Sequence, residues 1–528
     1  MNETTASGKP HALLRQTAAQ WQHYLVFTIC AILYLLPFMR VIFAGTDEGT
    51  LLCGAVRIVH GQVFARDYFE VMGPGTFYWL AVFFKLFGVT YLASRICLFT
   101  SSFGIALSLY YLTCQVCSRY RALPCVILAG TSFGVIWPGI SHHVDSNFFA
   151  LLSVVCMVLW KSRPAKSLLI VAGVFAGVTA TIHLPKGILL VCALLVWLWL
   201  QRKRTSMTLF APGLMLGSFL SVGALMLLYF RSQGALGSLI YENFTFPRQH
   251  YNSANNVVYA FSILKNYWTP WVTASGGGVW AVIIASILIL PLMLIAALPL
   301  LTVMAGIRFK WNPATPVIVL YWLCGWAIWL SEIHRKDIEH LAFGAPLLLI
   351  LCVHAVAESK RHIASIAVQI IAITAVFLAG INYFVVLAAG THPTATRVGK
   401  VAVFGSGSLL KFLDERVQAG EDIFIYPYGP TYYFLSATTN PTRYSFLQYN
   451  YNTPAQYQEV VNVLEEQQIR YVIWDTTFAA KAAVSSPGSQ PKSSSDLIIE
   501  PYLESRYKTI EDNNGVHVME RKGDDDAK

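Results

Sequence analysis

The chain has 528 residues, of which 55% are hydrophobic and only 12% are charged, with a mean hydropathy of +0.52 and a formal net charge of +10. A soluble protein carries about 25% charged residues, so this composition excludes a disordered chain, a coiled coil and an ordinary soluble enzyme. It predicts a polytopic membrane protein, whose positive excess reports first on the orientation of its loops and only then on an anionic ligand.

Long apolar runs recur from the N-terminal region to about residue 390. We predict about eleven transmembrane helices, each near the ~20 residues that cross a bilayer. They cover residues 24–43, 91–116, 122–137, 146–160, 167–182, 187–200, 207–230, 278–307, 315–330, 341–357 and 363–389. Residues 77–87 (FYWLAVFFKLF) are apolar but too short to span, so we expect an interfacial or re-entrant helix there. If that segment spanned, the sidedness of everything after it would reverse.

The loops between these runs give the orientation. The N-terminal segment is polar and basic, and no small-residue cleavage site follows the first apolar run, so we expect a retained span. Basic clusters such as Lys161/Arg163/Lys166 and Arg202/Lys203/Arg204 all fall on the side of the N-terminus, which predicts that this side is cytoplasmic. The first long loop (residues 44–90), residues 142–145, 183–186 and 332–340, and the tail are then external.

The tail, residues 391–528, changes composition and is rich in Tyr, Asn, Thr and charged residues. Residues 421–427 and 470–475 are typical of buried strands, and residues 455–468 alternate as a helix does. The sequence therefore predicts an all-α membrane part, residues 1–390, followed by a small extracytoplasmic α/β domain, residues 391–528.

The first external loop carries a set of motifs. Asp47-Glu48 directly follows the first predicted span, and Gly61-Gln-Val-Phe64-Ala-Arg66-Asp67-Tyr68-Phe69-Glu70 comes next. Pro74-Gly75 and an aromatic segment ending in Leu86-Phe87-Gly88 complete the set. This pattern resembles the GT-C superfamily of polyprenyl-phosphate-sugar-dependent glycosyltransferases, and in particular the group with the protein O-mannosyltransferases and the lipid A aminoarabinose transferase. The resemblance covers most of the chain in topology, with its motifs concentrated in roughly residues 45–90.

The resemblance implies a membrane enzyme that moves a sugar from a polyprenyl monophosphate to an acceptor hydroxyl or phosphate on the external face, with inversion at the sugar. Phosphate leaves without needing a proton, whereas the acceptor hydroxyl needs a base. By resemblance, Asp47 is the general base, Glu48 orients the acceptor and Asp145 supports either. The structural alternatives are that Glu48 interacts with the dipole of a helix starting near Gly49, and that Asp145 caps a helix starting at Ser146.

A lipid phosphate also requires cations. The external candidates are Lys186, Arg335, Lys336 and His340, all next to predicted span ends on the side that the positive-inside rule depletes of positive charge. The alternative is that these side chains only extend from the span ends toward the interface.

The remaining candidates for substrate contacts are Arg66, Asp67, Glu70 and His143, although Arg66 could simply pair with Asp67. In the aminoarabinose transferase relatives, a Glu of the segment matched by Tyr68-Phe69-Glu70 takes part in a metal site, but its partner histidine cannot be placed from this sequence. The adjacent His142 and His143 point in different directions on a helix and lack a ligand pair at i+4, which disfavours zinc there. The metal ligands are therefore left unassigned, no cofactor is certain, and a divalent metal stays open.

Two other classes of function stay open. A transporter or flippase for lipid-linked sugars would need paired halves or polar sites at mid-membrane, and neither is visible. A non-catalytic glycan-binding membrane protein has no such requirement. The expected partners are a polyprenyl-phosphate-sugar donor, a glycan, lipid or protein acceptor, and the bilayer of an inner or plasma membrane, with no nucleic acid. Neither the sugar nor the acceptor can be read from the residues.

Overall fold

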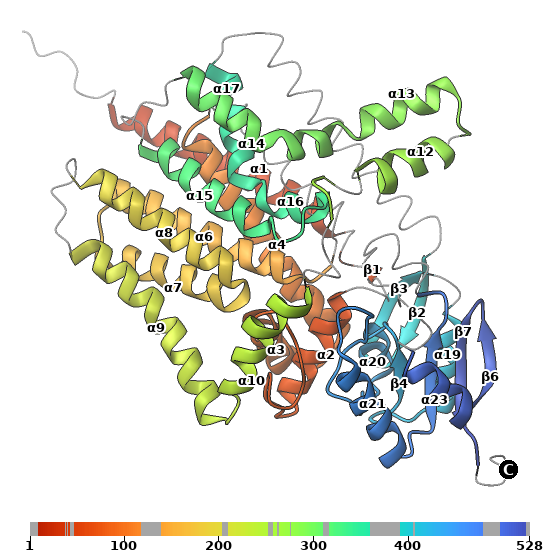
Figure 1. The fold of residues 1–528 in the computed structure, drawn as a ribbon. Helices are drawn as coiled ribbons and strands as arrows, with labels where there is room; N and C mark the ends of the chain where they lie inside the picture. Colours follow the sequence, from red (N-terminus) through yellow and green to blue (C-terminus); the bar gives the residue numbers. More distant parts are fainter. Residues whose placement is uncertain are drawn as a thin grey trace, which may run out of the picture.

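The computed structural model describes residues 9–36, 39, 41–42, 47–117, 139–202, 210–251, 257–260, 263–274, 276–309, 316–358, 391–404, 407–478 and 497–523. Within these ranges a helical bundle lies beside a smaller region that contains both β-sheets (Figure 1).

The helices of the bundle follow the apolar runs. The long ones are α1 (Lys9–Leu35), α4 (Tyr91–Cys114), α6 (His142–Ser162), α7 (Lys166–Ile182), α8 (Leu184–Gln201), α9 (Phe210–Ser232), α14 (Leu290–Phe309) and α15 (Pro316–Glu332). The shorter ones are α2 (Asp47–Val59), α3 (Gly75–Phe87), α10 (Leu236–Ile240), η2 (Tyr241–Thr245), η3 (Pro247–Tyr251), η4 (Ile263–Trp268), α12 (Thr269–Ala274), α13 (Val279–Leu288), α16 (Ile338–Gly344) and α17 (Pro346–Glu358).

Among the described residues, five helices are long and apolar enough to cross a membrane, or six if the bent pair α16 and α17 forms one span. The multi-pass prediction is therefore confirmed, whereas the count of about eleven is not. The predicted run 278–307 divides into α13 and α14, and α7 and α15 are shorter apolar helices. The predicted spans 122–137 and 363–389 lie outside the described residues.

The expected short helix in the first loop is α3, with 13 residues. At 1.5 Å per residue it is about 20 Å long, shorter than the ~30 Å hydrocarbon layer. Its Phe77, Leu80 and Phe84 are buried, in one hydrophobic cluster with Leu51 and Leu52 of α2. The first loop is therefore a packed part of the fold.

The strands of the tail belong to two sheets, one of which also includes β1 from before the first loop helices. In the three-stranded sheet, β3 (Gly399–Phe404) lies between β2 (Thr391–Thr396), with which it is antiparallel, and β1 (Val41–Ile42), with which it is parallel. The four-stranded sheet has the order β4 (Phe424–Tyr426), β5 (Tyr471–Asp475), β7 (Val516–Arg521), β6 (Tyr507–Asn513). Helices α19 (Ser408–Arg416), α20 (Thr431–Ser436), α21 (Pro454–Glu466) and α23 (Ile499–Arg506) accompany them. The predicted strand–helix–strand pattern corresponds to β4, α21 and β5, while the other strands were not predicted.

The tail docks on the first loop. Helix α20 packs against α2 so closely that a Cβ on Gly49 would lie 2.3 Å from the backbone nitrogen of Thr431. The Arg57 guanidinium of α2 donates to the carbonyls of Asn440 and Thr442, at 3.0 and 2.7 Å. The first loop and the tail, which we predicted to lie on the same side of the membrane, are thus in direct contact.

Candidate active site

Asp47 is the first residue of α2 and its side chain is exposed. The phenol of Tyr428, from the tail, donates a hydrogen bond of 2.7 Å to Asp47 Oδ1. The Tyr428 ring contacts Phe446 and Phe478, with ring centroids 5.2 and 5.6 Å away. One carboxylate oxygen of Asp47 is thus oriented by a fixed donor from a distant part of the chain.

Glu48, the next residue, is buried rather than exposed. It forms an ion pair with the buried Arg95 of α4, and Oε1 also accepts a hydrogen bond of 3.1 Å from the backbone nitrogen of Ile140. Glu48 also lies in the first turn of α2, as the helix-dipole alternative requires. The pair fixes the start of α2 against α4 and against the segment that leads into α6.

Asp145 lies in the first turn of α6 and is also buried. Ser101 of α4 donates a hydrogen bond of 2.7 Å to Asp145 Oδ1. The helix begins at His142, and the side chain that caps it is Ser141. The capping alternative for Asp145 is therefore wrong, because this carboxyl group faces α4 inside the bundle.

Glu332, the last residue of α15, is the acid around which several predicted site residues gather. Its Oε1 lies 2.7 Å from Lys186 Nζ, and its Oε2 lies 2.9 Å from His143 Nδ1. Lys186 also donates to Ser146 Oγ and Asn147 Oδ1, both at 2.8 Å. Lys186 is fully buried, and the Glu332 carboxylate balances its charge.

The segment after α15 carries the other predicted cations. Arg335 Nε donates to Asp337 Oδ2 at 2.5 Å, and His340 Nδ1 lies 2.6 Å from Asp337 Oδ1. Asp337 also caps α16 by accepting from the backbone nitrogen of His340. The charges of His340 and Arg335 together hold the pKa of Asp337 well below its usual range, against the effect of burial. Lys336 is half-buried, and its backbone carbonyl accepts from Ala260.

The remaining loop candidates divide into an exposed pair and a buried acid. Arg66 and Asp67 form a two-pronged ion pair, with both bonds at 2.8 Å. Glu70 is buried and accepts a hydrogen bond from Ser445 of the tail, and its backbone nitrogen donates to Glu242 of η2 at 3.1 Å. Glu242 in turn pairs with Arg443 of the tail at 2.8 Å. The alternative pairing of Arg66 is thus the one observed, and Glu70 lies where three segments meet.

Replacing Glu70 by Gln is expected to reduce the pH dependence of the protein's stability, because Glu70 is buried where the first loop meets the tail. Burial raises the pKa of Glu70 from 4.5 to about 8, and burial likewise raises the pKa of Glu242 to about 8. The folded protein thus holds protons that the unfolded chain releases above about pH 4.5, so stability falls as the pH rises from there to about 8. Thermal unfolding of detergent-solubilised protein between pH 5 and pH 9 measures this slope. An unchanged slope in the variant would contradict this.

Glu70 does not belong to a group of three or more potential metal ligands among the described residues. Only one group of three potential ligands comes together among the described residues, and it consists of His143, His183 and Glu332. Glu70 instead has a serine hydroxyl and the Glu242 carboxylate as neighbours. No step is therefore assigned to a metal at Glu70.

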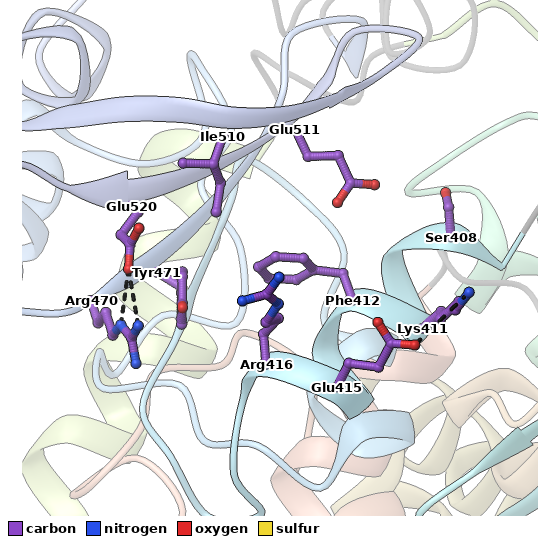
Figure 2. Close-up of a pocket in the computed structure, with 10 residues that line it drawn as sticks. All are labelled: Ser408, Lys411, Phe412, Glu415, Arg416, Arg470, Tyr471, Ile510, Glu511 and Glu520. Carbon is purple, nitrogen blue, oxygen red and sulfur yellow. Dashed lines mark hydrogen bonds and ion pairs between the residues drawn. The ribbon is translucent and has the colours of Figure 1, made fainter.

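A pocket in the tail is lined by none of these groups. Figure 2 shows that it lies between α19 and the strands β5, β6 and β7, with no residue of the first loop in its lining. Its charges compensate one another, since Arg470 pairs with Glu520 and Lys411 with Glu415. We do not include it in the site.

Sequence reasoning missed the partners of several candidates. Glu332, Glu242 and Tyr428 each bond a residue that lies at least 100 positions away, so no local spacing links them. The available signal was that Glu332 ends one apolar run at the predicted external face while Lys186 begins another there.

Comparisons with known proteins show a similarity in fold. No protein-family model matches the chain, and no curated protein matches it. The solved structures with a similar fold include ArnT from Cupriavidus metallidurans bound to undecaprenyl phosphate and the same protein in the apo state. The first has a TM-score of 0.56 and 11% identity over 96% of this chain and 99% of that one. The second has a TM-score of 0.54 and 12% identity over 95% and 98%. The chain therefore has the fold of ArnT over nearly its whole length, which confirms at the level of the fold the GT-C resemblance seen in the sequence.

Proposed function

We propose that this protein is a GT-C glycosyltransferase of a plasma or inner membrane that transfers a sugar from a polyprenyl phosphate to an acceptor on the external face. The observation that carries the proposal is that the first turn of α6, which holds Asp145, meets the segment after α15 where the His143 and His340 ring centroids lie 4.8 Å apart, while Asp47 at the start of α2 contacts the tail through Tyr428. The shared fold with a protein solved with undecaprenyl phosphate supports a lipid-phosphate donor.

The donor phosphate would lie against Arg335, Lys336 and His340. Arginine matches phosphate oxygens with two parallel hydrogen bonds, and lysine supplies a point charge. The Arg335 side chain retains 19% exposure, whereas the Lys186 side chain has none. We therefore assign Lys186 to positioning, since with Glu332 it holds α6, α8 and α15 together.

The acceptor would be activated by Asp47. The acceptor oxygen attacks the anomeric carbon, the bond from that carbon to the phosphate oxygen breaks, and the phosphate leaves with the electron pair. Asp47 takes the acceptor proton, and no covalent enzyme intermediate is needed when the sugar inverts. Glu48 orients the start of α2 through Arg95, and Asp145 accepts a hydrogen bond from Ser101 of α4, the helix that also carries Arg95. Arg66 and Asp67 form a solvent-accessible ion pair in the first loop, and we assign them to contacts with the acceptor.

The direct test measures binding and turnover separately. Purified protein in nanodiscs is expected to bind polyprenyl phosphate but not polyprenol, and to release polyprenyl phosphate from a labelled polyprenyl-phosphate sugar when a glycan or lipid acceptor is present. Movement of the labelled lipid across the bilayer without release would indicate a flippase. Binding without turnover for every acceptor tried would indicate a glycan-binding protein.

Tyr428→Phe is expected to lower turnover about tenfold while leaving the KM for the lipid donor unchanged. A hydrogen bond to a charged group contributes about 1.5–3 kcal/mol, and this one orients the proposed base without touching the phosphate. Steady-state kinetics at varied donor concentrations give both constants. An increase in KM with unchanged kcat would instead place Tyr428 in donor binding.

A further inference from the structure

Three side chains that can bind a metal ion converge where the first turn of α6, the start of α8 and the end of α15 meet. His143 lies in the first turn of α6, His183 lies between α7 and α8, and Glu332 ends α15. One donor atom from each lies within 4.8 Å of the other two, and all three side chains are buried. They come from three separate elements, so the fold rather than local spacing brings them together.

This donor set has a definite chemical preference. Two imidazoles and one carboxylate form the ligand set of catalytic zinc sites, in which a fourth position is left for water or substrate. Imidazole nitrogen favours zinc and similar transition metals over magnesium or calcium, which prefer oxygen ligands. The set therefore points to a cation of the zinc class.

The surroundings hold these ligands in place. The His143 ring stacks on Phe343 with centroids 4.8 Å apart and an interplanar angle of 9°. Lys186 binds Glu332 Oε1 and is itself anchored by Ser146 and Asn147, so Oε2 is the oxygen that faces His143. Such outer contacts orient metal ligands in known sites.

Two contacts would compete with a metal. The ammonium of Lys186 repels a dication, but it lies on the other oxygen of Glu332 and so leaves Oε2 available. The backbone nitrogen of Lys186 donates to His183 Nδ1, at 3.3 Å, which is long for a hydrogen bond. Binding a metal would replace this weak bond and the proton between His143 and Glu332 with three metal–ligand bonds.

We propose that His143, His183 and Glu332 bind one divalent metal ion of the zinc class, with a fourth position open to water or a substrate oxygen. The site does not involve Glu70, and it does not depend on the transferase activity.

The test is metal content and ligand geometry in the full-length protein. After removal of the affinity tag and of metal with a chelator, protein in nanodiscs is given Zn²⁺ or Co²⁺ and desalted. We expect one bound equivalent by mass spectrometry of the elements, and visible absorption bands of four-coordinate Co²⁺. Absence of stoichiometric metal in the folded wild-type protein overturns the proposal whatever the variants do.

Variants then identify the ligands. His183→Gln and His143→Asn are each expected to lose the stoichiometric metal and the Co²⁺ bands. His354→Gln is the matched control, because His354 is a half-buried histidine on α17 that bonds the carbonyl of Val116 instead. Full metal binding by both ligand variants, or its loss in the control, would refute the assignment. Turnover is measured in parallel, so failure of the transferase proposal is seen separately.

Discussion

Asp47→Asn is expected to abolish transfer of sugar from the lipid carrier, with a loss of roughly 10²–10⁴-fold, the usual contribution of a general base. The exposed amide can still accept the hydrogen bond from Tyr428, so the fold and the docking of the tail are expected to stay intact. The measurement is initial-rate turnover of labelled polyprenyl-phosphate sugar, with thermal unfolding run on the same preparation.

The matched control for this variant is Glu415→Gln. Glu415 is an exposed carboxylate on α19 whose only described ion pair is a 3.9 Å contact with Lys411. Its neutralisation changes the charge of the protein equally but should leave turnover as in the wild type. Retained turnover in Asp47→Asn would remove Asp47 from the mechanism and direct attention to Asp145, the buried acid in the first turn of α6.

Features of the fold that depend on residues close together in the chain could be predicted from the sequence, whereas contacts between distant residues could not. The apolar runs predicted helices because the bilayer imposes length and composition on each span separately, and α4, α6 and α8 lie where they were expected. The strands β4 and β5 were predicted for the same local reason, since each is a short buried run between polar segments. Strand β1, with two residues, has no such signal and exists through its pairing with β3.

In the candidate site, too, local motifs could be predicted, but contacts between distant residues could not. The motif around Asp47 and Glu70 marked the correct loop, but residue type did not distinguish an exposed base from a buried ion pair. Asp47 and Glu48 are neighbours with opposite environments, because the first turn of α2 directs one toward the tail and the other toward Arg95. Likewise, Lys186 was identified as an external cation, but its partner Glu332 lies 146 positions away (332 − 186) and only the packing of α8 against α15 brings them together.

Breaking the ion pair between Lys186 and Glu332 is expected to lower the stability of the protein strongly. Lys186→Met in metal-free protein is expected to lower the free energy of unfolding by about 3–5 kcal/mol, because it leaves the fully buried Glu332 carboxylate without its cation. Glu332→Gln should cost a similar amount by leaving Lys186 unpaired. The double variant removes both charges and should be more stable than the sum of the single losses predicts, by roughly 0.5–3 kcal/mol.

The wild type, the two single variants and the double variant are compared by unfolding in detergent. Tryptophan fluorescence follows the transition, and a chelator is present throughout. Lys411→Met serves as the control, because the Lys411–Glu415 contact is 3.9 Å long and largely exposed, and its loss should hardly change the unfolding transition. Additive losses in the double variant would mean that Lys186 and Glu332 act independently. The end of α15 would then be held against α8 by its apolar contacts, and Lys186 would again be a candidate for direct contact with the lipid phosphate.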